Sequence, residues 1–173
     1  FFKKGVTNND FTRKMETPKA DANMVWFSED IPYTTENAIK ASIAGQILSM
    51  VYIKKIREDA SAAYTCGASG SASIDDKDHN VTLFAYCPMK PEKADLALQI
   101  MRDEVTNLSK QCDASMLAKV KEYMVKEADN EAKTNGYWAG VISTWYRYGI
   151  DLHTDYKAHV AKQTPESISN FVK

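Results

Sequence analysis

The spacing of apolar residues along the chain predicts the order of its helices and strands. The longest helical pattern covers residues 35–56, where apolar side chains spread over a wide face. A helix with so broad an apolar surface is expected to be buried on more than one side. Residues 22–28, rich in Val, Trp and Phe, precede it as a predicted strand, which ends at Ile31-Pro32.

Two further strands are predicted after the long helix. Residues 64–74 are mainly Cys, Gly, Ala and Ser, and small side chains of this kind let another backbone approach closely. We therefore expect this strand to pack tightly against a helix or a neighbouring domain. Residues 81–87 are apolar on both faces, which predicts a central strand, and the acidic residues 75–78 predict the turn between the two.

The second half of the chain has helical spacing almost throughout. Pro91 suits the first turn of a helix that extends to Leu108, and Asp113 can cap the next one. Three more helices are expected: one after an interruption at Asn135-Gly136, one over residues 155–162, and one from Thr164-Pro165 onward. The order predicts an α+β fold, an antiparallel sheet with helices packed mainly on one face.

Composition narrows the class of protein. The 173 residues are 44% hydrophobic and 26% charged, which is typical of a globular protein, and they contain neither an internal repeat nor a long linker, so residues 1–173 are expected to form one domain. A net charge of −1 without basic clusters argues against nucleic acid, and no apolar run is long enough for a membrane span. Because the chain has neither an initiating Met nor a signal peptide, it is expected to be a piece of a longer polypeptide.

Most motifs that carry chemistry are missing. The three histidines have no partners at metal-ligand spacing and are interpreted as solvated surface residues, so no metal site is expected. Neither a glycine-rich phosphate loop nor a Gly-x-Ser-x-Gly elbow occurs. Cys66 and Cys87 could face each other across the predicted hairpin; a disulfide is one possibility, and two buried free thiols are the interpretation we favour.

Arg57 and Tyr64 are the exception. Arg57 falls near the end of the long helix and Tyr64 where the next strand begins, so a cation and a phenol can converge at one corner. A structural explanation is also open: Arg57 would complement the helix dipole or pair with a carboxylate, and Tyr64 would pack against the helix. Helical and strand spacing alone favours that structural explanation.

The residues around this corner resemble a known family. Lys55-Ile-Arg-Glu-Asp-Ala-Ser-Ala-Ala-Tyr64 is similar to the second-half signature of the pitrilysin/insulinase family of zinc metallopeptidases, in which a helix ends in Arg-Glu and a Tyr opens the next strand. Three further segments fit in the same order, so that the match spans residues 5–172: Tyr86-Cys-Pro-Met-Lys-Pro-Glu92, residues 112–126, and Thr134-Asn-Gly-Tyr-Trp138.

The resemblance implies a C-terminal domain that lacks zinc ligands and is inactive alone. The inverted His-x-x-Glu-His zinc motif is absent, so zinc is expected in a partner N-terminal half or subunit that closes with this domain around a chamber. By the same resemblance Tyr64 donates a hydrogen bond to the oxyanion of a peptide substrate, and Arg57 holds a substrate carbonyl. The alternative is a non-catalytic scaffold or interaction domain of a larger assembly.

Overall fold

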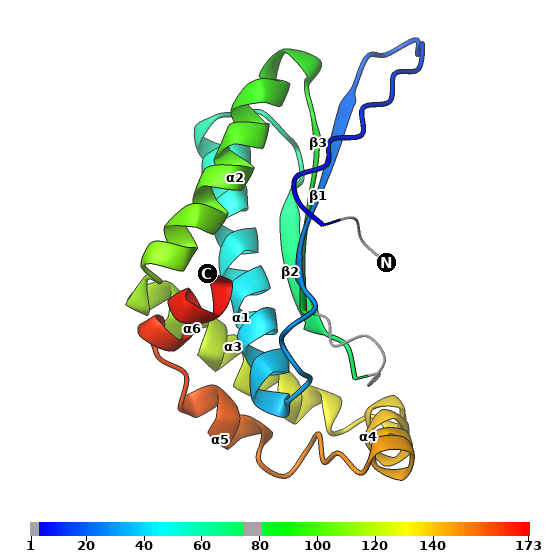
Figure 1. Cartoon of the computed structure of the whole chain (residues 1–173), viewed down its shortest axis with the longest axis vertical. Coiled ribbons are helices and arrows are strands. Elements are labelled where there is room, and N and C mark those ends of the chain that lie inside the picture. The colour runs from blue at the N-terminus through cyan, green and yellow to red at the C-terminus, as the bar shows by residue number, and fades with distance from the viewer. Residues whose placement is uncertain (1–3, 75–80) are drawn as a thin grey trace.

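The computed structural model describes residues 4–74 and 81–173, and most of its helices lie on one face of a small antiparallel sheet (Figure 1). The strands β1 (Ala20–Ser28), β2 (Gly67–Ala72) and β3 (Val81–Met89) are arranged in the order β1-β3-β2. This confirms both the α+β class and the central position of the strand predicted over residues 81–87. The predicted turn at residues 75–78 lies outside the described residues.

The strand register shows which side chains lie on each face of the sheet. β1 pairs with β3 from Ala20 opposite Met89 to Ser28 opposite Val81, and β2 pairs with β3 from Gly67 opposite Tyr86 to Ala72 opposite Val81. Alternate β3 residues, such as Ala85, are buried under the helices, whereas Phe84 and Tyr86 point to the open face. β3 is therefore central in the sheet but has only one buried face, although its sequence is apolar on both.

The long helix runs the length of the sheet. α1 (Thr35–Tyr52) begins with the Thr34 side chain accepting a hydrogen bond from the Asn37 N–H, and it continues without a break into a π-helix, η1 (Ile53–Asp59). As predicted, the small residues of β2 let α1 approach closely: a Cβ on Gly45 would lie 2.5 Å from the Ser69 carbonyl carbon. The tight packing of the glycine-rich strand is thus confirmed.

The remaining helices cover α1 and extend beyond it. A short 3-10 turn, η2 (Pro91–Lys93), leads into α2, and four further helices follow it along the chain (Figure 1). The helix predicted after Asn135-Gly136 includes both of these residues, because Thr134 serves as its N-cap. The helices that follow η2 are α2 (Ala94–Lys110), α3 (Ala114–Glu131), α4 (Asn135–Tyr148), α5 (Tyr156–Ala161) and α6 (Pro165–Val172).

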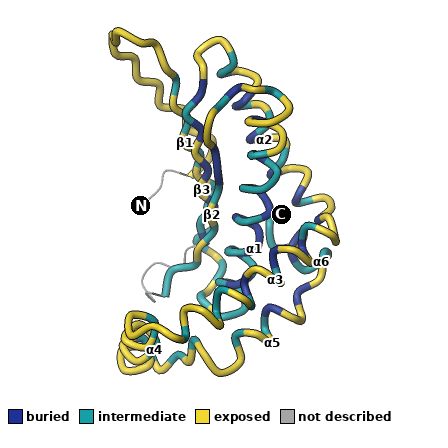
Figure 2. The backbone as a smooth tube through the Cα atoms, turned by 180° about the vertical axis from the view of Figure 1, so that it is seen from behind, coloured by how far each residue is buried: buried dark blue, intermediate teal, exposed yellow. Residues whose placement is uncertain are grey.

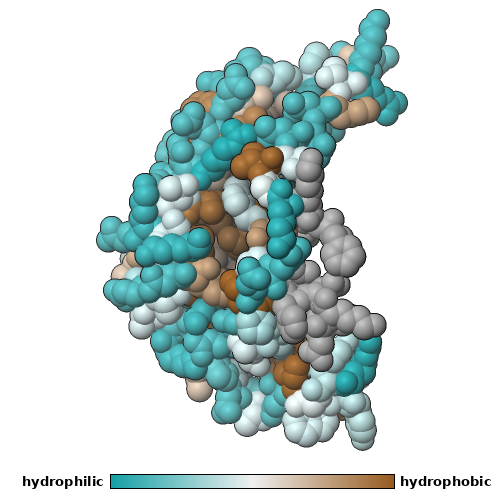
Figure 3. Space-filling view, in the orientation of Figure 1, coloured by the Kyte–Doolittle hydropathy of each residue, from teal (hydrophilic) through white to brown (hydrophobic). Residues whose placement is uncertain are grey.

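The core lies between α1, the sheet and the inner faces of α2, α3 and α6, as the buried residues in Figure 2 show. Tyr52 is fully buried, and its hydroxyl donates a hydrogen bond of 2.9 Å to the Met101 carbonyl of α2. In contrast, α4 contains no fully buried residue, and most of its side chains are exposed. The face in Figure 3 is mainly hydrophilic, with apolar side chains gathered near its middle.

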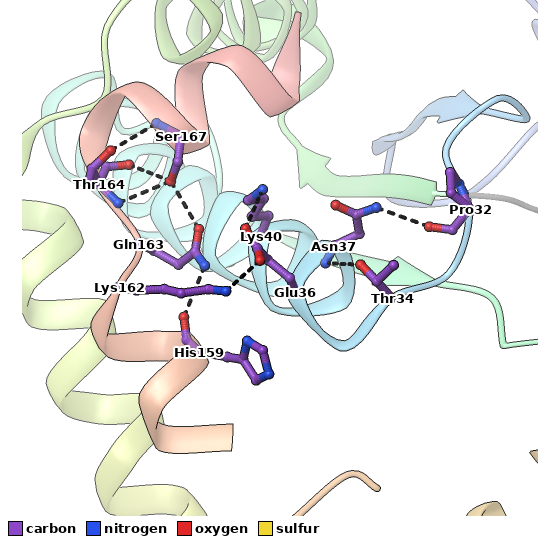
Figure 4. A network of polar contacts seen from close by, with 10 residues as sticks. All are labelled: Pro32, Thr34, Glu36, Asn37, Lys40, His159, Lys162, Gln163, Thr164 and Ser167. Carbon is purple, nitrogen blue, oxygen red and sulfur yellow. Dashed lines mark hydrogen bonds and ion pairs between the residues drawn. The ribbon is translucent and has the colours of Figure 1, made fainter. Parts of the chain in front are cut away.

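Polar contacts tie the beginning of α1 to the C-terminal helices (Figure 4). The Glu36 carboxylate forms ion pairs with Lys40, at 2.9 Å, and with Lys162, at 2.6 Å. Hydrogen bonds from both ammonium groups hold the pKa of Glu36 at about 2, well below its usual value. Thr164 and Ser167 form a reciprocal capping box at the start of α6.

Candidate functional site

The candidate site is the corner where η1 ends and the chain turns toward β2. The π-helical geometry is seen in the hydrogen bond of 3.1 Å from the Ala60 N–H to the Lys55 carbonyl, five residues earlier. Ile56 is fully buried and fixes this turn to the core. Arg57, the next residue, is exposed and lies in the last turn, where a cation complements the helix dipole.

The backbone after η1 is held by the core and by the end of β3. Ser61 adopts a φ of 50°, in the left-handed region that residues other than glycine rarely occupy. Ala62 is fully buried; its N–H donates to the Ile56 carbonyl at 2.9 Å, and its carbonyl accepts from the Lys90 N–H at 3.1 Å. This sharp bend sets the position of Tyr64, which is three residues beyond Ser61.

Arg57 and Tyr64 lie together on the surface. The guanidinium carbon of Arg57 is 5.6 Å from the centroid of the Tyr64 ring, and Tyr64 is 87% exposed. The convergence predicted from the sequence is therefore present. At an exposed site such a cation–π contact contributes about 0.5–1 kcal/mol, enough to orient the two side chains without burying either.

Three details of the predictions for this corner are wrong. Tyr64 does not begin the strand, since β2 starts at Gly67, and an isolated bridge between Ala63 and Met89 is the only pairing near it among the described residues. The structural explanation for Tyr64, packing against the helix, also fails because the ring is exposed. The long helix ends as an α-helix at Tyr52, and not at residue 56, because wider π-turns carry the chain onward. No glycine marks the bend at Ser61, so the local sequence contains no turn signal.

The nearby cysteines are buried free thiols, as favoured from the sequence. Cys66 immediately precedes β2, whose first residue, Gly67, pairs with Tyr86 of β3. If this register is continued by one residue, Cys66 aligns with Cys87. Burial raises the pKa of the Cys66 thiol, and the positive charge of Arg57 partly offsets this rise. Burial also raises the pKa of Cys87, to about 11. Both groups are protonated at neutral pH and are poor nucleophiles.

The described residues contain no group of three or more His, Cys, Asp or Glu side chains that could hold a metal ion. The histidine predictions need one correction. His153 is exposed, and its Nδ1 lies 2.8 Å from the Tyr137 hydroxyl, but His159 is half-buried with an Nδ1 that has no hydrogen-bond partner. His159 lies on α5, which packs against α1 and α3, so it is not the solvated surface residue that was predicted. His79 lies outside the described residues. Within the described part of the chain, no helix is long and apolar enough to cross a membrane.

The architecture defines the class of protein: an α+β domain whose sheet is covered by helices on one face. The family model of the peptidase M16 inactive domain matches residues 2–124. The chain therefore belongs to the peptidase M16 inactive domain family, which confirms the family assigned from the sequence. No curated relative matches the chain.

Solved structures share this fold. The periplasmic protease PqqL from Escherichia coli is similar over 91% of this chain and 18% of its own, with a TM-score of 0.73 and 18% identity. The ferredoxin protease FusC, in complex with Arabidopsis ferredoxin, is similar over 90% of this chain and 17% of its own, with a TM-score of 0.69 and 18% identity. A peptidase M16 inactive domain from Pseudomonas fluorescens has a TM-score of 0.67 and 15% identity over 86% of this chain and 36% of its own. The chain thus spans less than a fifth of the length of the two proteases.

Proposed function

We propose that this chain is the substrate-binding, chamber-forming C-terminal domain of a zinc-dependent endopeptidase. In this proposal it is one domain, residues 1–173, of a longer assembly, inactive alone, and the zinc belongs to a partner N-terminal half or subunit. Two facts support a partner half: the family is that of the M16 inactive domain, and the solved proteases are several times longer than this chain.

One observation carries the proposal: a phenol and a guanidinium are exposed side by side on a fixed corner. The Tyr64 hydroxyl forms no hydrogen bond and Arg57 no ion pair with the described residues, so both keep donors available for a ligand. Tyr64 then donates a hydrogen bond to the scissile carbonyl oxygen as negative charge develops on it. Arg57 holds a neighbouring peptide carbonyl and sets the register of the substrate.

The edge position of β2 supports a peptide substrate. β2 pairs only with β3 in the described sheet, and it begins three residues after Tyr64. Ser69 and Ser71 are exposed and small, which leaves room for an extended peptide to add along this edge. The substrate would then reach the Tyr64 hydroxyl from the start of β2.

The decisive experiment is Tyr64→Phe in the complete peptidase. Loss of one oxyanion donor costs about 2.7–4 kcal/mol, so kcat should fall by roughly 10²–10³ while KM changes little. Tyr146→Phe is the matched control, because Tyr146 is 84% exposed on α4. Both variants should unfold at the same denaturant concentration as the parent. Equal turnover of Tyr64→Phe and the parent would exclude the oxyanion role.

A scaffold domain is the second candidate, favoured by the exposed face of α4. Trp138, Ile142 and Trp145 follow helical spacing on a helix without buried residues, which is typical of an interaction surface. The sequence of the rest of the assembly distinguishes these two candidate functions. An inverted His-x-x-Glu-His motif in the same polypeptide or in a neighbouring subunit supports the peptidase, and its absence from both supports the scaffold.

A further inference from the structure

A second candidate site lies at the other end of α1, in a cavity of about 410 Å³. It is enclosed by the beginning of α1, the second half of α3, the first turn of α4 and the start of α5. Apolar groups, including Ile39 and Met124, form part of its lining. What distinguishes the cavity is its aromatic wall, which consists of four tyrosines from separate parts of the chain: Tyr33, Tyr123, Tyr137 and Tyr156.

The charged groups at this cavity are acidic. Glu127 and Glu131 of α3 line it, and none of the other described lining residues is Lys, Arg or His. Neither glutamate forms an ion pair with another described residue, although Asp129 on the same helix pairs with Lys157. Burial raises the pKa of Tyr137 and of Tyr156, and the negative charge of Glu131 raises both further, which places this carboxylate close to the two rings.

Rings and unpaired carboxylates together select a cation. The face of a tyrosine ring attracts an ammonium or guanidinium group within about 6 Å, and a carboxylate near the rings adds a direct charge interaction. The apolar lining accommodates the methylene groups of a long basic side chain, as lysine and arginine stems commonly pack. An anionic group would meet repulsion here, and a neutral aliphatic group would leave both carboxylates unpaired.

We propose that this cavity binds the side chain of a lysine or arginine residue of a peptide supplied in trans. The four tyrosines surround the methylene stem and the cationic group, and Glu127 and Glu131 neutralise its charge. The site does not depend on Arg57 or Tyr64. It lies at the opposite end of α1, whose 18 residues extend about 27 Å, so the two sites can be tested separately.

The test measures binding of labelled pentapeptides to the intact protein by fluorescence anisotropy. The peptides are acetyl-Ala-Ala-Lys-Ala-Ala-amide, its arginine counterpart, and a norleucine counterpart that keeps the chain length but lacks the charge. The basic peptides should bind saturably and at least tenfold more tightly than the norleucine peptide. Added salt should weaken only the basic peptides, because the discrimination rests on charge.

Variants locate the binding. The double substitution Glu127→Gln and Glu131→Gln should remove the tenfold preference for the basic peptides, and Tyr156→Leu should weaken their binding as well. Glu122→Gln is the matched control, since Glu122 is exposed on α3 but does not line the cavity. Tyr64→Phe should leave this binding unchanged even if it abolishes turnover. Equal affinity for the lysine and norleucine peptides, or an unchanged preference in the double glutamine variant, would overturn the proposal. An absence of saturable binding, as expected if another part of the same polypeptide fills the cavity, would also overturn it.

Discussion

A methyl group placed on Gly70 of β2 would lie 2.5 Å from the carbonyl carbon of Ala41 in α1. The helix and the strand therefore meet backbone to backbone, with no space for a side chain. Neither backbone can move away easily, because Ala41 is fully buried and β2 is held in register by β3. This contact sets the distance between α1 and the sheet.

Gly70→Ala should consequently be among the most damaging single substitutions in the chain. Overpacking against a fixed backbone is expected to lower the free energy of unfolding by roughly 3 kcal/mol. Gly140→Ala is the matched control: nothing lies within 4 Å of a Cβ there, and alanine favours a helix, so stability should rise by about 0.5–1 kcal/mol. Urea denaturation of both variants measures the difference. Similar midpoints for the two would show that the contact is not rigid.

Tyr52→Phe tests the polar link between α1 and α2. The Tyr52 hydroxyl is buried and donates to the Met101 carbonyl, so its removal should cost about 1 kcal/mol of unfolding free energy while keeping the packing of the ring. Tyr146→Phe removes a hydroxyl from an exposed ring and should change stability by less than about 0.5 kcal/mol. The pair is compared by thermal unfolding, and equal losses would contradict a specific role for the buried bond.

The ion pairs of Glu36 should make the stability of the folded protein depend on pH in the acid range. Its pKa is depressed to about 2 in the folded state, so its ion pairs stabilise the fold above the unfolded value near 4.5, and this contribution is lost as pH falls toward 2. Partly exposed pairs of this kind are worth less than about 1 kcal/mol each. Glu36→Gln should therefore be less stable than the parent at pH 7, and the gap should close between pH 4.5 and 2. A gap that stays constant over that interval would contradict the assignment.

The thiols predict a clear pattern of chemical modification. Cys66, Cys87 and Cys112 are buried, and burial raises the pKa of each, that of Cys112 to about 11. Reaction with a thiol reagent at pH 7 should be slow in the folded protein, and three free thiols should titrate once unreduced protein is unfolded. A titration of one thiol would instead reveal a disulfide, for which the aligned Cys66 and Cys87 are the candidates.

The gap between prediction and structure is largest where neighbours in space are distant in sequence. Apolar spacing predicts α1 and the central strand correctly, since periodicity is a local property of the chain. It does not predict the continuation of α1 as a π-helix or the bend at Ser61, because these depend on how Ile56 and Ala62 are held by the core. The partial burial of His159 is missed for the same reason, because α5 packs against α1 and α3, which come from other parts of the chain.

The sequence by itself determined the family and the α+β class and singled out Arg57 and Tyr64 as a candidate pair, because short motifs and periodicity are properties of consecutive residues. Only the tertiary structure decided that Tyr64 is exposed beside Arg57, and that four tyrosines and two glutamates from three helices and a connecting segment line one cavity. Exposure and convergence depend on which surfaces pack together. That packing is a property of the whole fold, and no single segment of the chain contains it.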